Sequence, residues 1–96
     1  MLESKFQKQI KDELTKTYPG IIILKNDPTY KQGFPDLLCL YNNKWVALET
    51  KRHKNASKRP NQEYYIDKLR TMSYAAFIEP ENKEEVFNEI QHTFRT

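Results

Sequence analysis

The sequence predicts an α/β sandwich with the element order αβββαβα, in which helices flank a central mixed sheet. Three observations in the 96-residue chain point to this class. Apolar residues recur every four positions near the start and again near the end, as on the buried face of a helix. Two neighbouring runs are apolar on both faces, as expected for central strands that are covered on each side. Only two residues separate these runs, which is typical of a hairpin.

The first helix is expected over residues 2–17. Its inner face carries apolar residues four positions apart, namely Leu2, Phe6, Ile10 and Leu14. Residues 18–20 include a proline and a glycine, which end the helix. Residues 21–25 then form a strand. Residues 26–34 form a loop in which Gly33 supplies conformational freedom.

The next two strands are expected over residues 36–41 and 44–49, joined by the turn Asn42-Asn43. Asparagine tolerates positive φ better than most residues, so a two-residue type I′ turn fits this pair. Each strand is too apolar for a surface sheet. The hairpin is therefore expected in the middle of the sheet.

A helix, a strand and a second helix are expected to complete the chain. Pro60 suits the first turn of a helix that runs to about Met72. Its inward stripe consists of Tyr65, Ile66, Leu69 and Met72. Residues 73–78 form a fourth strand, and Pro80 with several glutamates opens the last helix. The core-facing residues of this helix are Val86, Phe87, Ile90 and Phe94.

Length and composition favour a single soluble domain over residues 1–96. No apolar run is long enough to span a membrane, and the N-terminus lacks the apolar stretch of a secretory signal, so we expect a cytoplasmic protein. A domain of this size buries only a modest core, which makes a homodimer an expected form. The single cysteine, Cys39, lies between two leucines and is expected in the core, since no basic neighbour lowers its pKa.

Positive charge is concentrated in the loop after the third strand, although the net charge is only +3. Residues 51–59 contain no acidic side chain, which suits phosphate contacts at one place. The candidate DNA-binding residues are Lys31, Arg52, Lys54, Lys58 and Arg59, together with Tyr30. For each of these residues taken singly, a solvated surface position is the simpler interpretation. As a group they supply a salt-sensitive contribution to binding.

The hairpin register brings two carboxylates and a lysine to one place. With Asn42 and Asn43 as the turn, Asp36 falls opposite Glu49, where Cβ atoms lie roughly 4.5–5.5 Å apart. Lys51 is two residues beyond Glu49 and shares its face. Two adjacent carboxylates repel unless a cation or a proton lies between them. Mg²⁺ takes such oxygen ligands, and a bound Mg²⁺ polarises phosphodiesters and lowers the pKa of a bound water. A nearby lysine orients that water or stabilises the negative charge that develops on the phosphate.

The Glu-x-Lys spacing alone carries little weight, because three such triplets occur, beginning at residues 3, 49 and 81. The middle triplet differs because it ends an apolar strand, lies opposite Asp36 and precedes the basic loop. A surface salt bridge between Glu49 and Lys51 is the plain alternative, but it leaves Asp36 unexplained.

The pattern Gly-Phe-Pro-Asp at residues 33–36, followed by Glu-Thr-Lys at residues 49–51, resembles the PD-(D/E)XK nuclease superfamily. That resemblance implies a restriction-endonuclease-like sandwich. The continuation from residue 57 through residue 62 into a helix is similar to the VRR-NUC branch, which is related to Holliday junction resolvases. The valine-arginine-arginine signature of that branch is absent, since Arg52 and His53 follow the lysine here.

The resemblance implies a role for each matching residue. Asp36 and Glu49 correspond to metal ligands, with the carbonyl of Thr50 as a backbone ligand, and Lys51 to the catalytic lysine. Glu3 matches the acidic residue that the family carries on its first helix and is assigned to the metal, although a solvated first-turn glutamate is an equal alternative. Gln62 matches the family's helical glutamine and is placed in the catalytic set, with a buried structural amide as its rival.

By this resemblance, the expected activity is that of an Mg²⁺- or Mn²⁺-dependent endonuclease acting on branched DNA such as four-way junctions. Symmetric cutting of a junction needs two active sites, which again points to a homodimer. The small size suits a stand-alone protein of a virus or mobile element. Two alternatives stay open, a non-catalytic DNA-binding module of the same fold and a nuclease acting on RNA or unbranched DNA.

Overall fold

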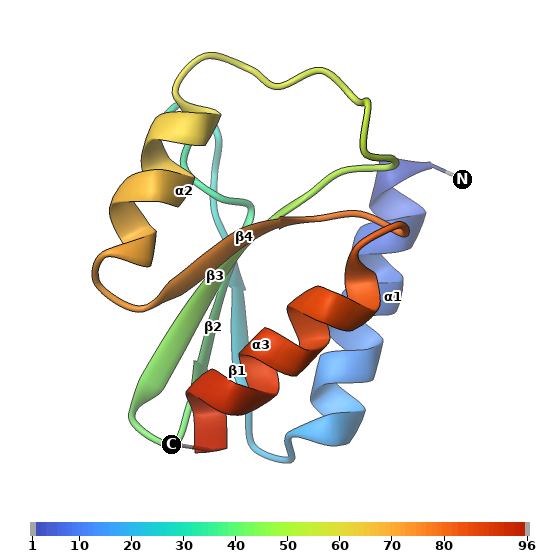
Figure 1. Cartoon of the computed structure of the whole chain (residues 1–96), viewed down its shortest axis with the longest axis vertical. Coiled ribbons are helices and arrows are strands. Elements are labelled where there is room, and N and C mark those ends of the chain that lie inside the picture. The colour runs from blue at the N-terminus through green and yellow to red at the C-terminus, as the bar shows by residue number, and fades with distance from the viewer. Residues whose placement is uncertain (1, 96) are drawn as a thin grey trace.

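The structure, a computed structural model that describes residues 2–95, contains three helices and four strands in the predicted order. They are α1 (Glu3–Thr17), β1 (Ile22–Lys25), β2 (Leu37–Tyr41), β3 (Lys44–Thr50), α2 (Gln62–Arg70), β4 (Tyr74–Ile78) and α3 (Lys83–Arg95). The strands form one sheet in the order β1-β2-β3-β4 (Figure 1). The β1–β2 and β2–β3 pairs are antiparallel and the β3–β4 pair is parallel, so the predicted mixed sheet is confirmed.

The β2–β3 hairpin has the predicted turn. Asn42 and Asn43 have φ angles of 51° and 57°, and positive values at both central positions are the requirement of a type I′ turn. The register runs from Tyr41 opposite Lys44 to Leu37 opposite Leu48. The next pair outward in the same register is Asp36 and Glu49. The turn chemistry has therefore fixed the alignment on which the predicted site depends.

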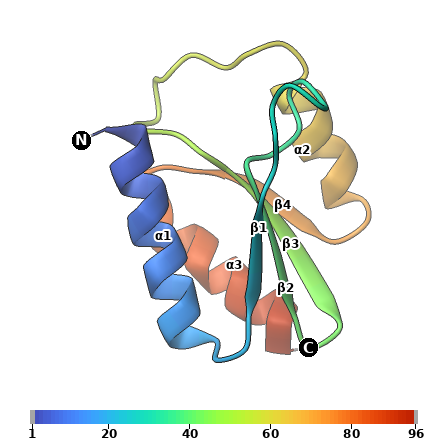
Figure 2. The ribbon, with the colours of Figure 1, turned by 180° about the vertical axis from the view of Figure 1, so that it is seen from behind.

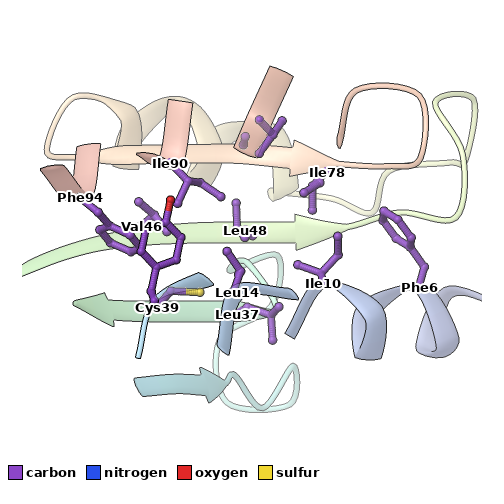
Figure 3. Close-up of a cluster of buried hydrophobic side chains, with 13 residues drawn as sticks. Phe6, Ile10, Leu14, Leu37, Cys39, Val46, Leu48, Ile78, Ile90 and Phe94 are labelled. Atoms are coloured by element: carbon purple, nitrogen blue, oxygen red, sulfur yellow. The ribbon is translucent and has the colours of Figure 1, made fainter. Parts of the chain in front are cut away.

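Helices cover both faces of the sheet. α1 and α3 lie side by side on one face and α2 lies alone on the other, as two opposite views agree (Figures 1 and 2). The first face holds the larger core, in which side chains of α1 and α3 meet those of β2, β3 and β4 (Figure 3). Cys39 is fully buried within this core, as predicted. Desolvation by burial raises the pKa of its thiol to about 12.

The face under α2 has a smaller core. Ile66 and Leu69 of α2 pack on Ala47 and Ala75 of the two central strands, with half-buried aromatic side chains around them. α2 lies over β3 and β4, and leaves the outer strand β1 with Ile22 and Leu24 about half exposed. This face is therefore only partly covered by the chain itself.

Three details of the helices differ from the predictions. Leu2 is 71% exposed because α1 begins one residue later, so Leu2 is not part of the buried stripe. α2 begins at Gln62 and ends at Arg70, two residues short of the predicted end at each side. Asn61 has a φ of 71°, which is not helical, and it separates Pro60 from the first turn. Met72 is 62% exposed because it lies beyond the end of α2, where helical spacing no longer applies.

The last helix follows its predicted pattern, with Val86, Ile90 and Phe94 buried and Phe87 half-buried at the edge of the core. Within residues 2–95, no helix is both long and apolar enough to cross a membrane.

Candidate active site

A cleft of about 830 Å³ lies at the end of the sheet where β3 finishes and β2 begins. Four segments surround it: the start of α1, the β1–β2 loop, the end of β3, and the long loop between β3 and α2. These segments converge at the same end of the molecule in both views (Figures 1 and 2). The cleft is lined by seven of the predicted site residues, namely Glu3, Asp36, Glu49, Lys51, Arg52, Arg59 and Gln62.

Asp36 is held in place through one of its two carboxylate oxygens. Oδ2 accepts a hydrogen bond from the Thr50 hydroxyl at 2.8 Å and longer ones from the Thr50 backbone N–H and the Gln7 side-chain amide, both at 3.3 Å. The backbone carbonyl of Asp36 also accepts a bond of 2.7 Å from the backbone N–H of Asn26. These donors on one oxygen fix the orientation of the carboxylate.

Gln7 is a site residue that the sequence did not predict. Its side-chain amide donates both to Asp36 and to the Thr50 hydroxyl, the latter at 3.0 Å, and only 7% of the residue is exposed. A signal was present in the sequence. Gln7 is four residues after Glu3 and three before Ile10, so it lies on the inner face of α1. A glutamine at such a position needs a buried partner.

Glu49 is buried beside Asp36, with 3% of the residue exposed. Its pKa is raised from 4.5 to about 8, first by burial and next by the charge of Asp36, with Lys51 acting in the opposite direction. Its Oε1 atom has no hydrogen-bond partner. A carboxylate in this setting is costly unless a proton or a cation joins it.

The Lys51 ammonium is 3.9 Å from Oε2 of Glu49 and donates a hydrogen bond of 3.1 Å to the carbonyl of Ser57. The lysine is only 6% exposed, and its backbone N–H continues the sheet by bonding to the carbonyl of Ile78. Because both partners are buried, the contact between Glu49 and Lys51 is not an ordinary surface ion pair. The hydrogen bond to Ser57 also ties the basic loop to the end of β3.

Only two buried side-chain polar atoms within residues 2–95 lack a hydrogen-bond partner. They are Oε1 of Glu49 and Nδ2 of Asn26, and both residues line the cleft. Buried polar atoms are nearly always paired, so an unpaired atom calls for a ligand, water or ion. Both unpaired atoms in the described part of the chain therefore belong to residues of this cleft.

The structure places the remaining predicted residues around this centre. Glu3 is exposed at the start of α1, lines the cleft, and is the smallest contributor to the raised pKa of Glu49. Thr50 is fully buried and uses its hydroxyl and N–H to hold Asp36; its carbonyl as a metal ligand stays a prediction. Gln62 is 6% exposed, and its Oε1 accepts a bond of 2.9 Å from the Arg59 N–H, so it anchors the loop while it lines the cleft.

The donor set at the centre suits a hard divalent cation, because carboxylate oxygens are the ligands that Mg²⁺ and Mn²⁺ prefer. The unpartnered Oε1 of Glu49 supports this fit. Within residues 2–95, no three side chains of the Asp, Glu, His or Cys type group closely enough to hold a metal by themselves. Asp36 and Glu49 are therefore the pair available, and Glu3 as a third ligand stays a prediction.

The predicted cationic residues divide into two groups. Arg52 and Arg59 line the cleft, together with Lys25, which was not predicted. The other three lie outside it. Lys31 lies over the ring of Tyr65 and Lys58 over the ring of Phe77, whereas Lys54 is exposed and bonds to Glu81 through its backbone N–H. No periodic pattern relates loop residues to one another, so the sequence did not distinguish the two groups.

In comparisons with known proteins, no family model, no curated protein and no solved structure matched the chain.

Proposed function

We propose that this protein is a metal-dependent nuclease that hydrolyses DNA phosphodiester bonds in the cleft at the end of β3. One observation carries the proposal. The buried Glu49 carboxylate, with an unpartnered oxygen, lies between the fixed Asp36 carboxylate and the Lys51 ammonium. Burying two carboxyl groups beside an ammonium group costs folding free energy, which argues that these side chains serve in a reaction.

Asp36 and Glu49 would hold Mg²⁺ or Mn²⁺, with Thr50 and Glu3 as the further candidates from the resemblance to PD-(D/E)XK nucleases. The bound ion supplies Lewis acidity toward a phosphodiester and lowers the pKa of a water. Gln7 and Thr50 keep Asp36 in one orientation through Oδ2. Lys51 orients the attacking water or stabilises the charge that develops on the phosphate.

The cationic side chains along the cleft, Lys25, Arg52 and Arg59, are exposed and suit contacts with the phosphate backbone. By the resemblance, branched DNA such as a four-way junction is the proposed substrate, and a homodimer supplies the two cuts that a junction needs. A cytoplasmic location is part of the same proposal.

A non-catalytic DNA-binding module explains the site less well. Two carboxylates repel a phosphate backbone, so a protein selected only for binding gains nothing from Asp36 and Glu49. A nuclease acting on RNA or on unbranched DNA uses the same residues and is distinguished by substrate preference.

The test incubates the protein with four-way, flap, single-stranded and linear duplex DNA and with RNA, in Mg²⁺, Mn²⁺ or chelator. We expect metal-dependent cleavage that falls about 10²–10³-fold or more in Asp36→Asn, Glu49→Gln and Lys51→Ala. Matched controls are Glu63→Gln and Lys68→Ala, which change exposed residues of α2 and should retain activity. Failure to cleave any substrate with either metal, by a folded protein, would overturn the proposal.

A further inference from the structure

Aromatic side chains gather beside the cleft, where the β1–β2 loop meets the start of α2. The rings of Phe34 and Tyr65 are edge-to-face with centroids 5.5 Å apart, and those of Tyr64 and Tyr65 are 5.2 Å apart. Tyr30 belongs to the same loop as Phe34. We call Tyr30, Phe34, Tyr64 and Tyr65 the aromatic rim.

The rim presents two rings to solvent. Tyr30 is 86% exposed and Tyr64 is 61% exposed, whereas Phe34 and Tyr65 are half-buried at the edge of the small core under α2. Apolar side chains that gather in one exposed patch often mark a binding site, whereas single exposed ones do not. Tyrosine offers a broad flat face at a low cost in side-chain entropy, which suits it to binding.

The loop that carries half of the rim is held against α2. Gly33 has a φ of 86°, and a Cβ at this position would come within 2.6 Å of the Asn61 Cβ and 2.7 Å of the Pro60 carbonyl. Only glycine fits this close approach. The β1–β2 loop lies next to the start of α2 in both views (Figures 1 and 2). The loop segment of the rim therefore lies against the start of α2, the helix that carries Tyr64 and Tyr65.

The rim carries positive charge and borders the candidate active site. The Lys31 ammonium lies 5.7 Å from the centroid of the Tyr65 ring. Phe34 and Gly33 belong both to the rim segment and to the wall of the cleft, as does Gln62 at the start of α2. Arg59 lines the cleft from the loop just before that helix. A nucleic-acid strand whose backbone runs along the cationic cleft thus has the aromatic rings of the rim beside it.

From this arrangement we propose that the aromatic rim binds unpaired bases of single-stranded DNA, which stack on Tyr30 and Tyr64 while the backbone enters the cleft. The inference rests on the proposed nuclease function and narrows its substrate to branched DNA with a single-stranded segment at the cut, such as a flap, in place of a fully paired four-way junction. Bases within a duplex have both faces covered by their neighbours and offer only edges. Unpaired bases expose a flat face, which an aromatic ring and a nearby cation bind regardless of sequence.

The test measures binding in chelator, so that cleavage does not contribute. Fluorescence anisotropy is recorded with labelled oligothymidine and with a DNA hairpin duplex of similar length. We expect tighter binding to the single strand, and about 10- to 100-fold weaker binding to it by the Tyr30→Ala/Tyr64→Ala double variant. The effect on duplex binding should be less than about threefold, because duplex binding depends mainly on the cationic residues.

Two controls isolate stacking. The Tyr30→Phe/Tyr64→Phe variant keeps the ring faces and should retain the affinity for the single strand. The Ile22→Ala/Leu24→Ala variant removes exposed apolar surface on β1, which is not part of the rim, and should also retain it. The proposal is overturned if the double alanine variant binds oligothymidine normally. It is equally overturned if that variant changes only the sedimentation of the protein, which would identify the rim as a contact between copies of the chain.

The binding assay tests the rim and the cleavage assay tests the nuclease function, so each proposal can be overturned without the other. Rim-dependent binding of oligothymidine without metal-dependent cleavage would overturn the nuclease function and leave the rim intact. Metal-dependent cleavage of fully paired and single-stranded DNA at equal rates, unaffected by the alanine changes, would overturn the rim alone.

Discussion

The two faces of the sheet differ in how completely the chain covers them. Under α1 and α3, side chains such as Ile10, Ile90 and Phe94 are almost fully buried in one continuous core. Under α2, a short helix of nine residues covers β3 and β4 with a small core, and aromatic side chains around it are left half-buried or exposed. The first face supplies stability, whereas the second leaves surface available for a ligand.

The candidate active site lies where these two regions meet. The closed side contributes Gln7 from α1, which holds Asp36. The open side contributes the start of α2 and the two loops that frame the cleft. The candidate site thus combines a helix packed in the larger core with loops at its open side, and loops held by a rigid scaffold commonly carry functional residues.

The largest expected effect tests the difference between the faces directly. Ile90→Ala should lower the free energy of unfolding by about 4 kcal/mol and Ile66→Ala by about 2 kcal/mol, both within the range for such truncations. Ile90 is fully enclosed, whereas the small cluster that contains Ile66 is bordered by half-buried side chains that are able to close around the space left. Urea denaturation of the two variants checks this, and equal losses would contradict the comparison.

The second prediction concerns Glu49 and pH. Its pKa is about 8 in the folded protein against 4.5 ordinarily, so the folded state binds the proton more tightly than the unfolded state. The contribution of Glu49 to stability is thus complete below about pH 4.5 and is lost as the pH rises through 8. In chelator at pH 8.5, Glu49→Gln should be more stable than the parent by about 1–3 kcal/mol.

Thermal unfolding in chelator at pH 5, 6.5 and 8.5 measures this effect. The matched control is Glu63→Gln, an exposed residue of α2, which should follow the parent at every pH. Parallel pH profiles for Glu49→Gln and the parent would show that folding does not raise the pKa of Glu49.

The third prediction concerns Gln7, the residue that α1 contributes to the site from the fully covered face of the sheet. Gln7→Leu removes the amide that holds Asp36 and Thr50 but keeps a side chain of similar size. Affinity for Mn²⁺, measured by calorimetry, should fall about 10- to 100-fold, as for other residues that orient a metal ligand. Stability should change by only about 1 kcal/mol. The control is Gln9→Leu on the exposed side of α1, and equal Mn²⁺ affinity in both variants would refute the role.

The smallest expected effect lies at the end of α2. Met72→Ser should change the free energy of unfolding by less than about 0.5 kcal/mol, because 62% of Met72 is exposed. Leu69→Ser, one helical turn earlier and buried, provides the contrast. A large loss for Met72→Ser in urea denaturation would mean that some partner covers the open face in solution.

The order of elements, the mixed sheet and the hairpin register could all be predicted from the sequence. The reason is that each depends on local rules. Helical spacing identifies α1 and α3, and the pair Asn42-Asn43 sets the alignment of the two strands beside it. Asp36 and Glu49 follow from that alignment, and Lys51 follows from the two-residue period of a strand. The centre of the site could therefore be predicted from the sequence because it lies on a hairpin.

The tertiary structure alone decided which distant groups join that centre. Gln7 reaches Thr50 across 43 positions of sequence, and Lys25 and Asn26 line the cleft from the end of β1 and the loop that follows it. It also decided that Arg52 and Arg59 face the cleft while Lys31 and Lys58 lie over aromatic rings. Loops have no repeating geometry from which such directions follow, since their course is set by what they pack against. The sequence by itself determined the acids and the lysine, and the packing of the chain determined what surrounds them.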